Sequence, residues 1–437
     1  MKILVQKFGG TSVRTPEARQ AAIGKVKKAL ADGYTVAVVV SAMGRSGEPY
    51  ATDTLLRLLR ASNPDVAGHE TDLLLCCGEI VSACVFAAEL QRAGFPARAM
   101  TGGQAGFETD DAYGSAHLLR VDPRPVMKIM AQGLIPVICG FQGMSRPDGQ
   151  LTTLGRGGSD TSAAALGVGL KASAVEIYTD VDGIMTADPR LVDHPRIMPR
   201  ISYGACCELA EQGAKVIHQR AVEIAQKGNI PLYVKCTFDD APGTLVTNVG
   251  SVAEQVSVEP RSFVNGITYI RDLTQYRVTL DGARAGQELF QNLADAGISV
   301  SCLNLSPTES MFSVYRDKTR ACATVLAAKG FTFRQNDRCA KVSVVGISVR
   351  GMPGLMASFV NALNRKGIEI LQTVDSNTSI SAIIKEEALK DAVVSLHEAY
   401  GLNRRFHQQS GRTGHKRREK HEKALFRKIA DRYGNAL

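Results

Sequence analysis

Short apolar runs alternate with longer amphipathic stretches in the first half of the chain, and this pattern leaves few possible folds. One amphipathic stretch starts at Thr15-Pro16-Glu17, an N-cap residue followed by proline, and continues toward Gly33. The apolar runs are rich in Val and Ile and are bounded by turn residues, which predicts buried strands. They are Ile3–Val5, Val36–Val40, Ile135–Cys139 and Val175–Thr179. The alternation predicts an α/β fold, a mostly parallel sheet sandwiched by helices.

The second half has a different pattern, in which one arrangement of elements occurs twice. Each copy has a strand, a glycine, a helix containing Phe and Asn, a glycine turn and a strand, and then a further strand and helix. The copies begin at the strand-like Tyr276–Leu280 and Lys341–Gly346. Two α+β units of the βαββαβ type are therefore predicted, with two unrelated segments as the weaker alternative. The expected domains are 1–247, a linker at 248–264, the paired units at 265–402 and a tail at 403–437.

Composition narrows the class of protein. At 437 residues the chain can form two or three domains. No stretch resembles the roughly 20 apolar residues of a membrane helix and Met1–Lys7 does not resemble a signal peptide, so we expect a cytoplasmic protein without a membrane partner. Ten cysteines lie mostly in apolar runs without a C-x-x-C pair. Buried, reduced thiols and no metal site are expected.

The formal net charge of +9 is concentrated in the tail. Residues 401–437 hold 11 Lys or Arg and 3 Asp or Glu, so the preceding part is close to neutral. A nucleic-acid partner is therefore not expected for the folded part. We expect the tail to be solvated, partly helical or disordered, and its charge leaves binding of RNA, anionic lipid or an acidic partner open.

A glycine motif, Lys7-Phe8-Gly9-Gly10-Thr11-Ser12, directly follows the first predicted strand. Bare glycine amides can approach a phosphate and can adopt left-handed conformations. The lysine before them can neutralise a phosphoryl group during its transfer. A plain glycine turn with a solvated lysine is the alternative for this hexapeptide taken alone.

A second glycine loop, Gly155–Ser162, precedes the predicted helix Ala163–Leu170. Ser159 or Asp160 suits the N-cap, so the positive end of the helix would face the same point as the glycine backbone. Arg156 lies between glycines, has little to pack against, and can hold a substrate carboxylate with its guanidinium fork. A capped helix after a flexible loop is the alternative.

Three further segments contain polar residues at positions where side chains often bind ligands. Tyr178–Gly183 ends a buried strand, where ligands gather in open α/β sheets, and its aspartates are expected to meet a magnesium–nucleotide complex or nucleotide hydroxyls. A structural Asx-turn is open for Asp182. Ser41–Gly44 ends another strand, and Thr52 follows it. Glu79 lies in apolar sequence and should meet a cation such as a substrate ammonium, because an unpaired buried carboxylate is unfavourable.

Taken together, these motifs resemble the aspartokinases of the amino-acid-kinase superfamily, in particular the monofunctional lysine/diaminopimelate-pathway type. The resemblance runs from Lys2 to about Leu402. Its motifs are KFGGTSV at 7–13, VVSAMG at 39–44, GRGGSDTSA at 155–163, TDVDGIMTADPR at 179–190 and GAKVI at 213–217. The resemblance implies the amino-acid-kinase fold for 1–247 and tandem ACT domains for 265–402. In this family one ACT unit interrupts the other.

The resemblance also implies roles for individual residues. Lys7 and Asp160 would be catalytic, with Lys7 neutralising the phosphoryl oxygens and Asp160 orienting the active-site cations. The residues implied to bind substrate are Ser41, Thr52, Glu79 (ammonium), Arg156 (α-carboxylate), Gly157, Gly158 and Ser159. The residues implied to bind ATP are Lys7, Phe8, Gly9, Gly10, Ser159, Thr179, Asp180, Met185, Asp188, Arg190, Lys215 and Val216.

The implied activity is transfer of the ATP γ-phosphoryl group, with Mg²⁺ carried by the nucleotide, to the β-carboxylate of L-aspartate. This reaction is the first step of lysine/diaminopimelate, threonine and methionine biosynthesis. Lysine, diaminopimelate or threonine would act as effector near Leu280–Gln287 and Ile298–Ser306, in a homo-oligomer formed through the ACT domains. Two alternatives are a related kinase with another acidic or carbamoyl substrate, and a catalytically silent amino-acid sensor.

Overall fold

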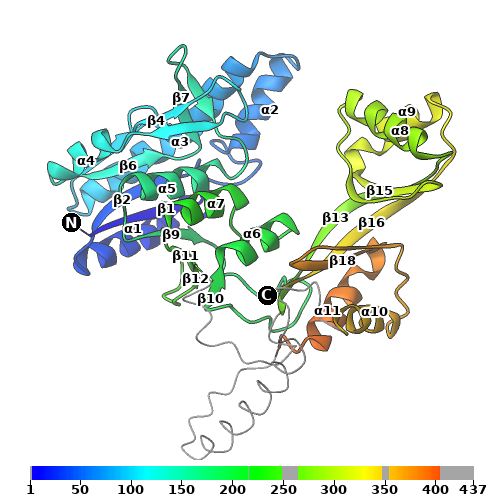
Figure 1. Ribbon diagram of the computed structural model, residues 1–437. Helices are drawn as coiled ribbons and strands as arrows, with labels where there is room; N and C mark the ends of the chain where they lie inside the picture. The colour runs from blue at the N-terminus through cyan, green and yellow to red at the C-terminus, as the bar shows by residue number, and fades with distance from the viewer. Residues whose placement is uncertain (1, 215, 249–263, 347–353, 404–437) are drawn as a thin grey trace, which may run out of the picture. The chain divides into compact units, whose positions relative to one another are not determined.

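The computed structural model describes residues 2–214, 216–248, 264–346 and 354–403 (Figure 1). The predictions for the linker, the tail and Lys215 therefore fall largely outside the described residues. An eight-stranded sheet has the order β10-β12-β11-β9-β1-β2-β6-β3. Its strands are β1 (Ile3–Phe8), β2 (Thr35–Val40), β3 (Ala97–Met100), β6 (Ile135–Cys139), β9 (Ala174–Thr179), β10 (Arg200–Ser202), β11 (Leu232–Cys236) and β12 (Thr244–Thr247). All of these pairings are parallel except β11–β12.

Helices cover both faces of this sheet (Figure 1). The helices of this half of the chain are η1 (Gly10–Ser12), α1 (Pro16–Ala31), α2 (Thr52–Ser62), α3 (Gly68–Arg92), α4 (Arg124–Ala131), α5 (Gly158–Gly169), α6 (Tyr203–Glu211) and α7 (Gln219–Gly228), of which α2 contributes no buried residue. Alternate side chains of β1 point to opposite faces, so Leu4 packs with α1 and α3 whereas Val5 packs with α5 and α7. Helix α1 begins as predicted, because the Thr15 hydroxyl accepts a bond from the Ala18 amide at 3.2 Å. The predicted α/β class is confirmed.

A second, smaller sheet of the first half was not predicted. Its strands are β4 (Phe107–Thr109), β5 (Leu118–Val121), β7 (Gln142–Ser145) and β8 (Leu151–Thr153), in the order β5-β4-β7-β8. The buried Asp72 of α3 fixes the sheet, since its carboxylate accepts bonds from the Thr153 amide (2.7 Å) and the Thr153 hydroxyl (2.8 Å). Strands of three or four residues show too little periodicity to be recognised in sequence.

Helix α3 changes one expectation drawn from composition. Its best 18-residue window has a mean hydropathy of 2.0, so by length and composition the helix could cross a membrane. The expectation that no apolar stretch of the chain approaches this length was therefore wrong. Half of that window is buried inside the structure, and Phe86 and Leu90 of α3 belong to the hydrophobic core that α1 and α3 form with the central sheet. These contacts are typical of a core helix.

The cysteines are all free thiols. Six are buried, as predicted, and burial raises the pKa of the Cys206 and Cys322 thiols. Cys77 and Cys84, however, are exposed on α3 and depart from the prediction. Among the described residues there is no group of three His, Cys, Asp or Glu side chains that could hold a metal ion.

The second half forms a six-stranded antiparallel sheet in the order β14-β15-β13-β16-β18-β17. Its strands are β13 (Val264–Thr279), β14 (Ser301–Leu305), β15 (Glu309–Tyr315), β16 (Phe333–Gly346), β17 (Gln372–Asp375) and β18 (Ser379–Lys385). Its helices are α8 (Ala283–Asp295), η5 (Arg316–Lys318), α9 (Thr319–Ala328), α10 (Leu355–Asn364), η6 (Glu386–Ala388) and α11 (Leu389–Ala399). The two predicted α+β units both form.

The two units are nested, because both share the long strands β13 and β16. The later part of β13 pairs with β15, whereas the later part of β16 pairs with β18. The inner unit, 271–338, therefore lies within the outer unit, whose described residues are 264–270, 339–346 and 354–402. The sequence division into two consecutive copies was wrong in connectivity, since the first strand starts at Val264 and not at Tyr276.

The outer unit packs against a segment that follows β9. The hydroxyl of Thr186 and Nε2 of His397 lie 2.9 Å apart, and the Tyr269 hydroxyl donates to Asp188 at 2.6 Å. Val192 belongs to the hydrophobic core of the outer unit. We call this contact region, residues 184–198 against the outer unit, the junction.

Candidate active site

The carboxyl ends of three neighbouring strands bring the predicted motifs together. Strands β9, β1 and β2 are adjacent and parallel, so the segments that follow them leave the same edge of the sheet. The Gly9 amide donates to the Tyr178 carbonyl at 3.3 Å, and the Gly44 amide donates to the Gly10 carbonyl at 3.1 Å. These bonds join the segments into one loop cluster.

Glycine at position 10 is required by packing between these loops. A Cβ atom there would lie 2.8 Å from the carbonyl oxygens of both Ala42 and Gly44. Neither Gly9 nor Gly10 has a positive φ, so neither uses the left-handed conformation that glycine can adopt. The glycines instead let the β2 loop pass against the β1 loop without a clash.

Lys7 and Asp160 form an ion pair at this edge. Lys7 is the last but one residue of β1, Asp160 lies in the first turn of α5, and the two charged groups are 2.7 Å apart. Both side chains are nearly buried, at 11% and 13% exposure. The other carboxylate oxygen of Asp160 accepts a bond from the His218 amide at 3.3 Å. The structure therefore brings the two predicted catalytic residues into direct contact.

The second glycine loop, which contains Arg156, leads directly into the helix that carries Asp160 of this ion pair. Helix α5 begins at Gly158 with the left-handed Gly157 as its N-cap, which corrects the prediction of Ser159 or Asp160. Gly157 has no room for a side chain, because a Cβ atom would lie 2.0 Å from the His218 ring. Arg156 is exposed, and its guanidinium has no hydrogen bond or ion pair within the described ranges. A donor fork without a protein partner is available to a ligand.

His218 connects these groups electrostatically. Burial lowers its pKa, and the charges of Arg220 and Arg156 lower it further against the opposing effect of Asp160. The lowered pKa favours the neutral form of the imidazole. His218 could not be selected from the sequence, since a single histidine without a motif carries no signal.

Glu79 on α3 forms a hydrogen bond with the loop that follows β2. The residue is 2% exposed, and one of its oxygens accepts a bond from the Ala42 amide at 3.1 Å. The other oxygen has no partner among the described residues. Burial raises the Glu79 pKa to about 8, although the Ala42 bond opposes this. The predicted cation is thus not supplied by a described protein side chain, and one buried acceptor is left for a ligand.

An exposed ion pair spans the loop cluster. The Arg45 guanidinium lies 2.5 Å from Asp180, so the loop after β2 is linked to the loop after β9 across the glycines of β1. Thr179 donates its hydroxyl hydrogen bond to Asp180 at 3.2 Å. Arg45 follows the predicted VVSAMG motif directly but was not selected from the sequence.

The other predicted substrate residues lie around the same edge. The Ser41 amide donates to the Phe8 carbonyl at 3.1 Å, and Thr52 is the first residue of α2. Gly158 and Ser159 are buried at the start of α5, where a Cβ atom on Gly158 would contact Phe141 at 2.8 Å.

Asp188 and Arg190 have contacts at the junction. Their side chains pair at 2.7 Å, and the Tyr269 hydroxyl donates to the same carboxylate at 2.6 Å. Burial raises the Asp188 pKa, but the bonds from Arg190 and Tyr269 outweigh it and hold the pKa at about 2. Met185 forms an isolated bridge with Ile197. Contact of these residues, and of the half-buried Val216, with a nucleotide stays a prediction.

Comparisons with known proteins agree with this architecture. A model of the Amino acid kinase family matches residues 2–236, and an ACT domain model matches 334–398. The chain is 44% identical over 409 residues to Aspartokinase 1 of Bacillus subtilis, covering 92% of this chain and 100% of the relative. It is 38% identical over 412 residues to the aspartokinase of Geobacillus stearothermophilus, covering 92% and 98%.

Solved structures share the fold. Escherichia coli aspartokinase III in complex with aspartate and ADP matches with a TM-score of 0.72 at 24% identity, covering 91% of this chain and 99% of that one. Aspartate kinase from Synechocystis matches with a TM-score of 0.51 at 32% identity, covering 91% and 69%.

The parallel sheet with its loop cluster and the match to the family define a kinase of the amino-acid-kinase class, a phosphotransferase whose acceptor is a carboxyl group. The regulatory half adds ACT units to that class. Within it, the chain belongs to the aspartokinases, as its identity to the Bacillus enzyme over nearly its whole length shows.

Proposed function

We propose that this protein transfers the γ-phosphoryl group of ATP to the β-carboxylate of L-aspartate, which gives 4-phospho-L-aspartate. The observation that carries the proposal is the Lys7–Asp160 ion pair of 2.7 Å at the carboxyl edge of the sheet. The same loop cluster holds a buried glutamate and an arginine without a partner among the described residues. The E. coli relative of similar fold was solved with aspartate and ADP, which supports the same pair of ligands.

The phosphoryl group would meet Lys7 at the glycine loop. An aspartate β-carboxylate with an ordinary pKa near ~4 is already ionised at pH 7, so the reaction needs no general base. Rate enhancement then comes from positioning and from stabilising charge on the phosphoryl oxygens. Asp160 holds the Lys7 ammonium in one orientation before the nucleotide arrives.

Mg²⁺ bound to the nucleotide would supply further neutralisation of phosphate charge. The residues that fit such an ion are Asp160 and Asp180, because carboxylate oxygens are the ligands Mg²⁺ prefers. Asp180 is 39% exposed and is held by Arg45, so it is accessible from solvent at the same loop cluster.

The α-carboxylate and the ammonium group of the aspartate substrate require a cationic and an anionic partner, respectively. Arg156 offers a guanidinium fork for the α-carboxylate, and the Glu79 oxygen that has no partner in the described part of the chain offers an acceptor for the ammonium. The bound ammonium would favour the ionised form of Glu79 and so lower its pKa from the raised value. The roles proposed for Ser41, Thr52 and the glycines of the second loop follow from the family motifs.

Regulation by an end-product amino acid is proposed for the inner unit. The segments Leu280–Gln287 and Ile298–Ser306 lie next to each other, since a Cβ atom on Gly286 would contact Leu305 at 3.3 Å. An E. coli aspartokinase III structure was solved with lysine and aspartate. Lysine, diaminopimelate or threonine is therefore the effector we propose, in a cytoplasmic homo-oligomer that serves lysine, threonine and methionine biosynthesis.

The test is product trapping with hydroxylamine in the presence of ATP and one acceptor at a time. Aspartate should give aspartyl hydroxamate, while glutamate and N-acetylglutamate should give none. Hydroxamate from another acceptor, with none from aspartate, would contradict the substrate assignment. Binding of amino acids without any hydroxamate would indicate a sensor and contradict the activity.

A further inference from the structure

A polar pocket lies on the same sheet as the candidate active site but on the face covered by α1. It has a volume of about 430 Å³ and is bordered by α1, by β1, β9 and β11, and by the loop 239–242. Pockets of about 300–1,000 Å³ hold small organic ligands. Gln6 points into this pocket whereas the neighbouring Lys7 belongs to the active site, because successive side chains of a strand point to opposite faces.

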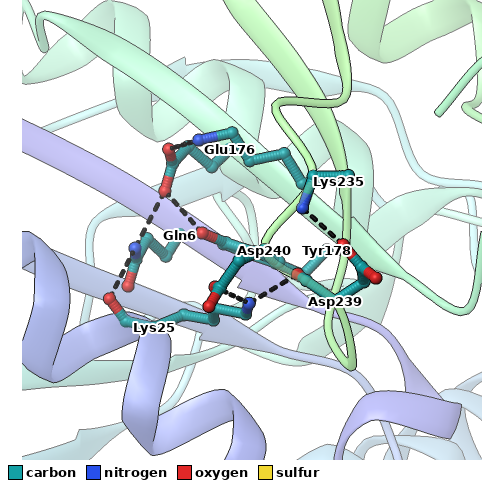
Figure 2. A network of polar contacts seen from close by, with 8 residues as sticks. Gln6, Lys25, Glu176, Tyr178, Lys235, Asp239 and Asp240 are labelled. Atoms are coloured by element: carbon teal, nitrogen blue, oxygen red, sulfur yellow. Dashed lines mark hydrogen bonds and ion pairs between the residues drawn. The ribbon is translucent and has the colours of Figure 1, made fainter. Parts of the chain in front are cut away.

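The floor of the pocket is a buried carboxylate network. Glu176 accepts bonds from Lys235 Nζ (2.5 Å), Gln6 Nε2 (2.8 Å) and the Tyr178 hydroxyl (3.0 Å), as Figure 2 shows. Its two oxygens therefore have partners. Gln6 is 1% exposed and its amide nitrogen donates into the network, but its carbonyl oxygen Oε1 has no partner among the described residues. A buried acceptor of this kind requires an N–H or O–H donor from a ligand or water.

The rim of the pocket carries ammonium groups with unused donors. Lys25 Nζ donates to the Asp239 carbonyl (2.6 Å) and to Asp240 (2.7 Å), and both bonds are drawn in Figure 2. Lys28, one helical turn further along α1, lines the pocket without a hydrogen bond in the described part of the chain. The Tyr233 ring, with Lys235 Nζ 5.1 Å from its centroid, supplies an apolar wall.

This polarity is unusual for the middle of a parallel sheet. On the opposite face the same strands present the buried Val175, Ile177 and Val234, and helices cover them. Central parallel strands are normally apolar on both faces. A buried Glu–Lys pair is weak evidence for stability, and neither group takes part in the proposed phosphoryl transfer.

We propose that this pocket binds a small zwitterion of the amino-acid class. The ligand's ammonium would donate to Gln6 Oε1 at the floor, and its carboxylate would accept bonds from Lys28 and Lys25 at the rim. An inorganic anion would use the lysines but would leave Gln6 Oε1 unpaired. A simple amine would pair with Gln6 but would leave Lys28 unused. A ligand with both charges satisfies the floor and the rim at once.

Binding can be located by acetylating the lysines of the full-length protein with a soluble acylating reagent and measuring each site by mass spectrometry. Individual L-amino acids, inorganic phosphate and putrescine are the probes. At least one amino acid should lower acetylation of Lys28 fivefold or more while Lys27, exposed on the same helix but outside the pocket, stays unchanged. Protection by phosphate or putrescine alone, or by no probe, would overturn the proposal.

Variants at the pocket distinguish amino-acid binding in this pocket from binding at an effector site elsewhere in the protein. Lys28→Glu should weaken the Lys28-protecting amino acid at least tenfold in equilibrium dialysis, and Lys27→Glu should leave its affinity unchanged. Gln6→Met, which removes the acceptor with little change in volume, should also abolish binding. Hydroxamate formation should be retained in Lys28→Glu, so failure here is distinguishable from failure of the proposed activity. Wild-type affinity in Lys28→Glu would refute the pocket.

Discussion

The catalytic and regulatory halves bury polar groups of different kinds. At the loop cluster of the first half, the nearly buried groups include three that are charged or ionisable, namely Lys7, Asp160 and Glu79. In the nested units the fully buried side-chain contacts between strands are neutral. Ser343 and Ser381 lie 2.8 Å apart, and Gln275 donates to Gln372 at 3.0 Å.

The difference follows from what each half has to do. A buried charge is unfavourable unless it is paired, so it persists where a charged ligand or transition state requires it. Neutral amide and hydroxyl networks have a smaller desolvation penalty and still specify which strands pair. Five predictions test this contrast, in order of decreasing effect.

Replacing Lys7 by alanine should lower kcat by about 10²–10³, by analogy with removal of one donor to a developing oxyanion. The aspartate KM should change little, because Lys7 is assigned to the phosphoryl group. Steady-state hydroxamate assays measure both constants. Lys2→Ala, at an exposed position just before the same strand, is the matched control and should behave as wild type.

Replacing Arg156 by alanine should raise the aspartate KM by about 30-fold or more, the equivalent of roughly 2 kcal/mol for a lost charged contact. Arg156→Lys should recover only part of this, since an ammonium cannot form a bidentate fork. Folding should be unaffected because the side chain is exposed. An unchanged KM in both variants would remove Arg156 from the substrate site.

Aspartate binding should release a proton near pH 7. Burial raises the Glu79 pKa to about 8, so the free enzyme carries a largely protonated carboxyl at this pH. The substrate ammonium favours the ionised form, so up to one proton leaves on binding. Calorimetry in buffers of different ionisation enthalpy gives this number directly. Proton release that persists unchanged in Glu79→Gln would contradict the assignment.

Replacing Gln372 by methionine should destabilise the nested sheet by about 1–3 kcal/mol while leaving kcat within about twofold, because buried partners lose a bond but no charge is uncovered. Gln372 accepts from Gln275 at 3.0 Å and donates to Asn304 at 2.9 Å, which links the outer and inner units. Denaturant unfolding and the inhibition curve for each amino acid are the measurements. A loss of turnover comparable to that of Lys7→Ala would break the contrast between the halves.

The junction should lose stability in mild acid. His397 is 1% exposed, and burial, followed by the charge of Arg196, lowers its pKa to about 4. Between pH 4 and the ordinary value of 6.5 the unfolded state binds more protons, so the His397 contribution is complete above pH 6.5 and is lost as pH falls toward 4. His397→Asn should flatten this part of the stability–pH curve. An unaltered slope would mean that His397 is not the titrating group.

The strands and the catalytic motifs could be predicted because their signals are local. Val36–Val40 is apolar along its whole length, and the Thr15-Pro16 cap marks the start of α1, so both were found close to their observed bounds. The edge at which Lys7 and Asp160 meet follows from parallel strands and a helix that starts after a glycine loop.

Other features depend on contacts distant in sequence and could not be predicted. The interruption of the outer unit by the inner one requires knowing that Val264–Ile270 pairs with the later part of β16. The placement of Asp188 at the junction depends on Tyr269, 81 residues away. Arg45 and His218 have no motif of their own and were found only because the fold brings them to the loop cluster.

The central claim, that Lys7 acts on the phosphoryl group and not on substrate binding, is tested most directly by single-turnover transfer from γ-labelled ATP in Lys7→Ala, with both dissociation constants measured separately. The account predicts aspartate and ATP affinities within a few-fold of wild type and phosphoryl transfer slowed by about 10² or more. Transfer at the wild-type rate, or a slow rate explained entirely by lost affinity, would contradict it.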